Sequence, residues 1–140
     1  HVQNLAANIS KPCTGIRVWD GKGIEFYYTS DTEFRANIME RYPNSQAVFH
    51  DCTFMPPYEG SVHTHYQHLK GLTVAARNAI VLMHYTTIPK WVDVNEDGFI
   101  GAARRHDTWV VDEAGARLST NGPLKSLDVE VVPEFEWVDP

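Results

Sequence analysis

The sequence predicts a single α+β domain over residues 1–140, in which one helix lies on a curved, mainly antiparallel sheet. The length of 140 residues suits one ordinary domain, and 43% hydrophobic residues are enough for its core. Apolar and polar residues alternate along most of the chain, which is typical of half-buried strands separated by turns. A meander of long strands behind one helix would curve into a cone or half-barrel, and its concave side would hold a cavity.

The charge and the apolar runs exclude several classes of protein. Eighteen acidic residues against twelve basic ones give a net charge of −6, which disfavours a nucleic-acid partner. The longest apolar runs are far too short for a membrane span, so we expect no membrane partner. No signal peptide is visible, which slightly favours the cytoplasm, although the N-terminus is open to processing.

The first third of the chain predicts an arm, a hairpin and a helix. Residues 1–15 read as an N-terminal arm or short helix. Alternating runs on either side of an Asp-Gly turn, residues 16–19 and 24–28, predict a β-hairpin. Ser30 followed by Glu33 resembles a capping box, and the spacing of the apolar residues after it predicts a helix over 31–42.

The remaining residues predict a meander of strands. The expected strands cover residues 46–54, 62–75, 79–88 and 99–111, followed by a hairpin turn at 112–115, a last strand to about residue 132, and a C-terminal tail at 133–140. A tight turn at 76–78 and a loop at 89–98 would join them.

Two segments carry a family resemblance. Arg105–Leu118, with the sequence RHDTWVVDEAGARL, and Leu72–Leu82 resemble consecutive hairpins of the NTF2-like superfamily, including its SnoaL-like and ketosteroid-isomerase-like members. The resemblance covers roughly residues 62–120 and implies a cone-shaped fold around a small-molecule cavity. Members of that superfamily usually open with two long helices, which are not evident here. Since the superfamily includes enzymes and non-catalytic binders, the resemblance alone selects no function.

A cluster of histidines is the first candidate site. On a strand, His63 and His65 would point to the same side, and such a pair can hold a metal ion. A third ligand would have to come from elsewhere in the chain, and the options are His84, His50, Asp51, His106 and Asp107. The alternative is that these histidines make ordinary hydrogen bonds at a pocket or a sheet edge.

The second candidate site lies in the expected strand 99–111. Alternation would place Arg104 and His106 on one face, and Asp107 and Trp109 on the other. If the first face lines the cavity, His106 is the acid or base; if the second does, Asp107 is. A ladder of surface ion pairs is the alternative.

These observations favour a protein that binds a small, partly apolar organic ligand. As an enzyme it would be an isomerase, dehydratase or cyclase that transfers protons without a cofactor. His106 or Asp107 would carry the proton, His63 or His65 would assist, and Tyr85 or Tyr66 would stabilise an oxyanion. Substrate contacts are expected from Arg104, Tyr66, Trp109 and Trp91.

Two other functions stay open. One is a non-catalytic domain that binds a ligand or serves in assembly. The other is a metal-dependent enzyme built on His63 and His65. We expect the protein to be a homodimer.

Overall fold

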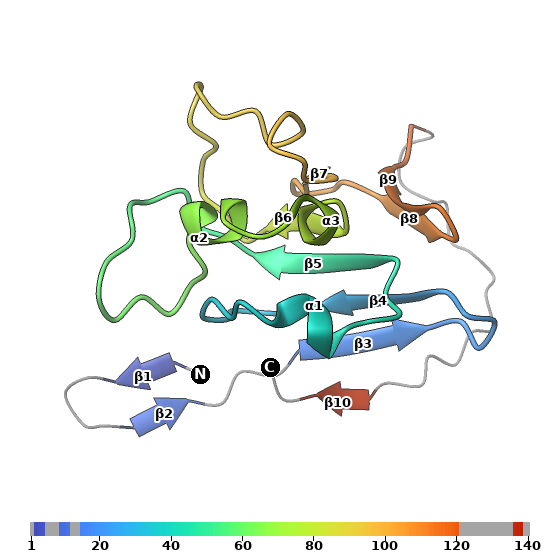
Figure 1. Ribbon diagram of the computed structural model, residues 1–140, viewed down its shortest axis with the longest axis horizontal. Coiled ribbons are helices and arrows are strands. Elements are labelled where there is room, and N and C mark those ends of the chain that lie inside the picture. Colours follow the sequence, from blue (N-terminus) through green and yellow to red (C-terminus); the bar gives the residue numbers. More distant parts are fainter. Residues whose placement is uncertain (1, 5–8, 12–14, 121–135, 139–140) are drawn as a thin grey trace.

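The computed structural model describes residues 2–4, 9–11, 15–120 and 136–138, and its centre is a six-stranded sheet (Figure 1). The strand order in this sheet is β10-β3-β4-β5-β6-β7, and β1–β2 and β8–β9 form two further two-stranded sheets. The strands are β1 (Val2–Asn4), β2 (Ile9–Lys11), β3 (Gly15–Trp19), β4 (Glu25–Tyr28), β5 (Ala47–Asp51), β6 (Ile80–Met83), β7 (Gly101–Ala102), β8 (Trp109–Asp112), β9 (Gly115–Leu118) and β10 (Glu136–Val138). The helices are α1 (Ile38–Arg41), α2 (Tyr66–Lys70) and α3 (Val74–Arg77).

The mixed α+β content is confirmed, but the central sheet is mixed rather than mainly antiparallel. β4, β5, β6 and β7 pair in parallel, and antiparallel pairing in the central sheet is limited to β10–β3 and β3–β4. All four residues of β6 are buried, as expected for a strand covered on both faces of a parallel sheet. Among the described residues this sheet stays open, so they do not form the predicted cone.

Both hairpins form at the turns where the sequence predicts them. The β3–β4 hairpin forms where it was expected, with Asp20 Oδ1 accepting hydrogen bonds from the Lys22 and Ile24 amides in its turn. The β8–β9 hairpin also forms, around the turn at 112–115.

Several elements differ from the prediction. The arm or short helix expected over residues 1–15 contains the paired strands β1 and β2, and the tail expected over 133–140 contains β10, which pairs with β3. The helix expected over 31–42 is reduced to α1. Ser30 has a positive φ of 55°, outside the extended region that is typical of an N-cap. The long strand expected over 62–75 is replaced by α2 and α3, whose apolar faces are one turn long and give too little periodicity to recognise. The strand expected over 99–111 is broken into β7 and β8. The strand expected to reach about residue 132 lies mostly outside the described residues.

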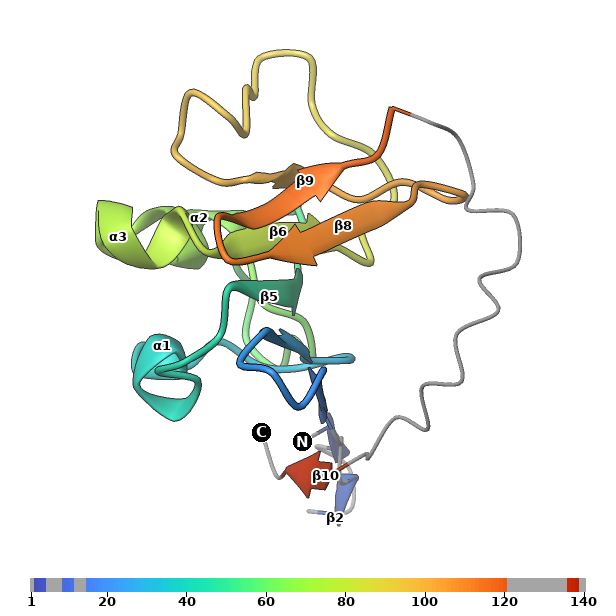
Figure 2. The same ribbon diagram turned by 90° about the vertical axis from the view of Figure 1, so that its right-hand side faces the viewer.

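The helices and the β8–β9 hairpin cover opposite faces of the sheet (Figure 2). The core on the helix side joins alternate strand residues to α2, and its members include Tyr27, Val48, Ile80, Leu82 and Leu69. On the other face, the Trp109 ring packs edge-on against Phe49 with centroids 6.1 Å apart. A Cβ on Gly101 would lie 3.0 Å from the Trp109 ring, so glycine is needed there for the hairpin to pack so closely. None of the described helices is long and apolar enough to cross a membrane.

Candidate functional site

Polar side chains gather where three neighbouring parallel strands end. Asp31 follows β4 after a short turn, Asp51 is the last residue of β5, and His84 comes directly after β6. In open sheets with parallel strands, the carboxyl ends of the strands are the usual place for a ligand site. The parallel pairing of β4, β5 and β6 therefore brings together residues that are far apart in the sequence.

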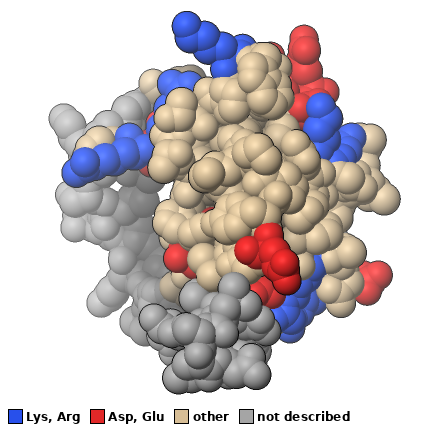
Figure 3. All heavy atoms as spheres, turned by 90° about the vertical axis from the view of Figure 1, so that its left-hand side faces the viewer, with Lys and Arg blue, Asp and Glu red and all other residues tan. Residues whose placement is uncertain are grey.

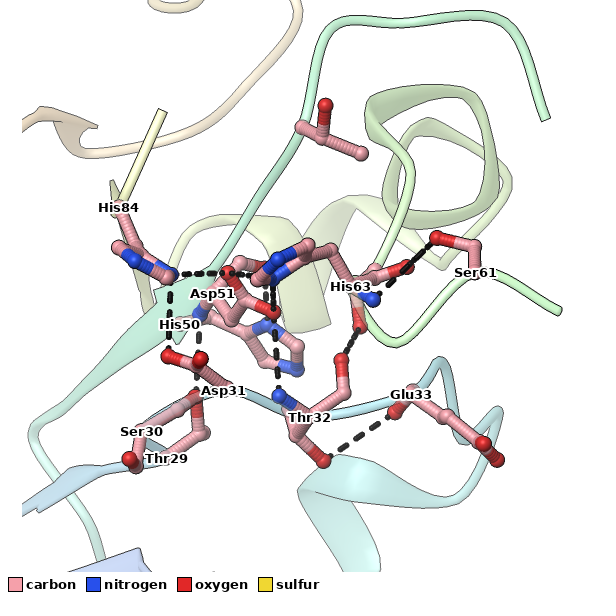
Figure 4. Close-up of polar contacts among 12 residues, drawn as sticks. Thr29, Ser30, Asp31, Thr32, Glu33, His50, Asp51, Ser61, His63 and His84 are labelled. Carbon is pink, nitrogen blue, oxygen red and sulfur yellow. Dashed lines mark hydrogen bonds and ion pairs between the residues drawn. The ribbon is translucent and has the colours of Figure 1, made fainter. Parts of the chain in front are cut away.

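The loop after β5 returns to this edge and adds a fourth side chain. The Thr53 amide donates to the Thr64 carbonyl at 2.7 Å, and the Tyr66 amide donates to the Thr53 carbonyl at 2.8 Å. The Thr64 hydroxyl donates to the Thr32 carbonyl at 2.8 Å, which ties the loop to the segment after β4. These bonds place His63 beside the end of β5 (Figure 4).

Asp51 is the buried centre of the arrangement. Its side chain has no exposed surface, and Oδ2 accepts hydrogen bonds from the Thr32 amide at 3.1 Å and from His63 Nδ1 at 3.0 Å. Oδ1 lies 3.1 Å from His84 Nδ1. A buried carboxylate is costly unless it is paired, and Asp51 is paired on both oxygens. Because an ionised carboxylate only accepts, each of these histidines must carry its proton on Nδ1.

Asp31, His63 and His84 form a group with the spacing of metal ligands. One candidate ligand atom from each lies within 4.8 Å of the other two. Because Nδ1 of each histidine faces Asp51, Nε2 is the ring nitrogen left to bind an ion. His84 Nδ1 is also 3.1 Å from Asp31 Oδ1, which brings the two side chains together, and the His63 and His84 ring centroids are 5.0 Å apart. Two imidazoles and one carboxylate are a ligand set found in catalytic zinc sites, where a fourth position stays open for water or substrate.

Backbone strain coincides with this group. Ser30 and His84 both have positive φ, 55° and 62°, in the left-handed region that residues other than glycine rarely adopt. Such conformations are costly, and they concentrate at functional sites where the surrounding structure enforces them. The positive φ of His84 occurs where its imidazole turns toward Asp31 and Asp51.

Two neighbouring groups are held uncharged by burial. Burial lowers the pKa of His50, whose Nδ1 donates to the Asp51 carbonyl at 2.7 Å, so this imidazole is neutral. Burial also raises the pKa of the Cys52 thiol, and the nearby Asp51 carboxylate raises it further. Cys52 is therefore a packed thiol rather than a nucleophile.

Of the histidine pair predicted from the sequence, one member lies at this site. His63 belongs to it, but His65 precedes α2, is 2% exposed, and donates from Nδ1 to the Met55 carbonyl at 2.9 Å. Because residues 62–65 are not a strand, alternation does not bring the two imidazoles to one side. Metal binding by His63 and His65 stays a prediction, and the group with the spacing of metal ligands joins His63 to His84 and Asp31.

The second predicted cluster lies in the turn between β7 and β8. Asp107 Oδ2 accepts from the Arg104 amide at 2.7 Å, and His106 is exposed with φ of 72°. The premise that these residues alternate along a strand is wrong, because the chain turns between β7 and β8. A catalytic role for His106 or Asp107 stays a prediction.

The predicted aromatic residues are dispersed. The buried Tyr66 donates its hydroxyl to Asp97 Oδ2 at 2.5 Å, and Trp91 is 81% exposed. Tyr85 follows His84 and lines a hollow with Arg104, while Trp109 packs on the sheet. Of the residues predicted as catalytic or substrate-binding, only His63 belongs to the group at the strand ends.

Sequence reasoning named Asp51 and His84 only as optional third ligands and missed Asp31 altogether. The available signal was positional: each of the three comes at or shortly after the end of an apolar strand. That signal becomes informative only once the strands are known to be parallel neighbours.

A comparison with protein families identifies the family of this chain. A family model described as "Anti-Pycsar protein Apyc1" matches residues 1–109, which include Asp31, Asp51, His63 and His84. No curated protein matches the chain. The family match has no bearing on the resemblance to the NTF2-like superfamily.

Proposed function

The chain belongs to the anti-Pycsar Apyc1 family, and from that premise we propose that it is a metal-dependent phosphodiesterase that counteracts cyclic nucleotide signalling. The proposed reaction is the hydrolysis of a cyclic nucleotide. Water adds to phosphorus, the bond from phosphorus to one ribose oxygen breaks, and that oxygen takes up a proton. The product is a linear nucleotide.

The observation that carries the proposal is the group Asp31, His63 and His84 at the ends of the parallel strands. Their nitrogen and oxygen donors suit a divalent transition-metal ion such as zinc better than calcium or magnesium, which prefer oxygen ligands alone. A bound ion of this kind supplies charge stabilisation at the phosphoryl oxygens and a nucleophile from water near neutral pH.

Asp51 has a separate part in the proposal. Since it contacts the Nδ1 atoms of both His63 and His84, it fixes their tautomer and ring orientation. Carboxylates behind metal-binding histidines have this role in many metalloproteins. Thr32 holds the carboxylate in turn through its amide.

The sequence also suggested proton-transfer chemistry of the isomerase or dehydratase type at His106 and Asp107. That function predicts turnover without a metal ion and dependence on those two residues. The phosphodiesterase proposal predicts the opposite on both points, so one set of assays separates the two.

The test is hydrolysis of cyclic nucleotides by the full chain with zinc and after chelation with EDTA. We expect zinc-dependent turnover that falls at least about 100-fold in His84→Ala and in Asp31→Asn. Asp112→Asn is the matched control, because this carboxylate pairs with Arg117 in the β8–β9 hairpin. Turnover that survives chelation, or that is unchanged in both site variants, would contradict the proposal.

A further inference from the structure

A second group of polar side chains lies at the same sheet edge, one strand beyond His84. β7 pairs in parallel with β6, and the Ala103 amide donates to the Leu82 carbonyl at 2.8 Å. The chain after β7, which includes Arg104, therefore leaves the sheet at the edge where His84 follows β6. The proposed hydrolysis uses none of the residues after β7.

The segments that follow β6 and β7 enclose a hollow of about 450 Å³. This volume is within the range of roughly 300–1,000 Å³ that is usual for small-molecule sites. Three hydroxyl groups and two guanidinium groups belong to its described lining: those of Tyr85, Thr86, Thr87, Arg104 and Arg105. No carboxylate is among the described residues of this lining, so the hollow carries two positive charges and no negative one.

Both arginines of the hollow are available to a ligand. Arg104 and Arg105 are exposed, and neither guanidinium forms an ion pair with another described residue. Elsewhere in the described chain, Lys70 and Arg117 are each paired with a carboxylate. A guanidinium group is always charged and presents its donors in a planar fork that matches the oxygens of a phosphate or a carboxylate.

Tyr85 contributes a hydroxyl group that is not used within the chain. This hydroxyl is buried and has no well-formed hydrogen bond to a described residue, although it lies beside Arg104. Burial raises the pKa of Tyr85, so the hydroxyl keeps its proton and can donate it in a hydrogen bond. Because a buried donor without an acceptor is costly, an anion in the hollow would remove part of that cost.

One carboxylate lies near the hollow without belonging to its lining. Asp107 Oδ2 accepts from the Arg104 amide at 2.7 Å, but no ion pair joins it to the Arg104 guanidinium. Figure 3 looks onto the edge where the parallel strands end: acidic atoms gather near the centre, and lysine and arginine atoms lie toward the margins. This edge therefore carries groups of opposite charge in different places.

We propose that the hollow of Tyr85, Thr86, Thr87, Arg104 and Arg105 is an anion site that binds a phosphate group. The two guanidinium groups donate to the phosphate oxygens, and the threonine hydroxyls donate to those that remain. A phosphate group offers more acceptor oxygens and more negative charge than a carboxylate, so it can use more of these donors. The site needs no metal ion and does not depend on the proposed function.

Titration of inorganic phosphate into the full chain, followed by phosphorus NMR, tests this proposal. EDTA is present throughout, so that no metal ion at Asp31, His63 and His84 binds the phosphate. We expect saturable binding by the wild type and binding about tenfold weaker in Arg104→Gln. The combination of Arg104→Gln with Arg105→Gln should abolish saturation in the same range. No saturable binding by the wild type, or unchanged binding in the double variant, would overturn the proposal.

Two further variants show whether the effect is local. Lys22→Gln removes a positive charge from the exposed β3–β4 turn, outside the described lining, and should leave phosphate binding unchanged. Asp107→Asn removes the neighbouring negative charge but keeps a carbonyl oxygen for the Arg104 amide, and should tighten phosphate binding by about threefold. Circular dichroism shows whether each variant is folded. An equal loss in Lys22→Gln would mean that the protein attracts phosphate only through its overall charge, which would contradict a site.

Two other ligands identify the chemistry that the site takes. Acetate should bind more weakly than phosphate, and acetate that binds as tightly would contradict the choice of a phosphate group. Adenosine monophosphate distinguishes the sources of that group. If it binds more tightly than inorganic phosphate and loses its binding in the double variant, the site takes a phosphate carried by a nucleotide. Equal affinities, lost together in the double variant, identify a site for free phosphate.

Discussion

Replacing Asp51 by asparagine tests whether the buried carboxylate organises the metal ligands. The substitution keeps the shape of the side chain but removes its charge and turns one acceptor into a donor. In the native arrangement both oxygens of Asp51 are used, one by Thr32 and His63 and the other by His84. Because the asparagine amide cannot accept on both sides, at least one histidine loses the partner that fixes its tautomer.

The size of the effect follows from the burial and the number of contacts. Loss of a carboxylate behind a metal-binding histidine typically weakens metal binding by about 10- to 100-fold, or about 1.4–2.8 kcal/mol. Asp51 serves two of the three proposed ligands, and its side chain is fully buried, so water cannot replace it. We therefore expect a loss near the upper end, about 100-fold.

Competition with a chromophoric chelator measures zinc affinity in the wild type, Asp51→Asn and the control Asp112→Asn. Circular dichroism of the same samples shows whether each variant is folded. Zinc affinity of a folded Asp51→Asn protein that equals the wild type would refute the role of Asp51. An equal loss in Asp112→Asn would show that the effect is not local.

Three further predictions concern the core around the site. Burial lowers the pKa of His50 from 6.5, so the unfolded chain binds a proton that the folded chain excludes. As pH falls below about 6.5, the free energy of unfolding should therefore drop more steeply in the wild type than in His50→Asn. Urea titrations at several pH values measure this difference. Tyr66→Phe removes the hydroxyl that donates to Asp97 and should cost about 1–2 kcal/mol in urea unfolding, and no change would mean that the bond is not formed. Leu69→Ala, at a fully buried core position, should cost about 2–5 kcal/mol by the same measurement, and a smaller loss would contradict its place in the core.

Local sequence signals predicted the features that depend on neighbouring residues. The β3–β4 hairpin follows from one Asp-Gly turn between two alternating runs, and its register involves residues close together in the chain. The same holds for the β8–β9 hairpin. By contrast, α2 is a single helical turn with a few apolar positions, which fits a strand pattern equally well.

The site depends on pairing between distant strands, which one sequence does not reveal. The cluster of histidines points to His63, whereas Asp31 lies in a segment whose pattern predicts the start of a helix. Its proximity to His84 follows from β4, β5 and β6 being parallel neighbours, a non-local arrangement. Alternation along the chain favours an antiparallel meander instead, and that arrangement places candidate chemistry on His106 and Asp107, which lie in a turn of the structure.

The position of a bound metal ion tests the central claim most directly. Crystals of the full chain soaked in zinc, measured by anomalous diffraction at the zinc absorption edge, give that position without any assumption about substrate. The account predicts a peak in contact with Asp31, His63 and His84, with Asp51 behind the two imidazoles. No peak there, or a peak only at other histidines such as His65 and His68, would contradict it.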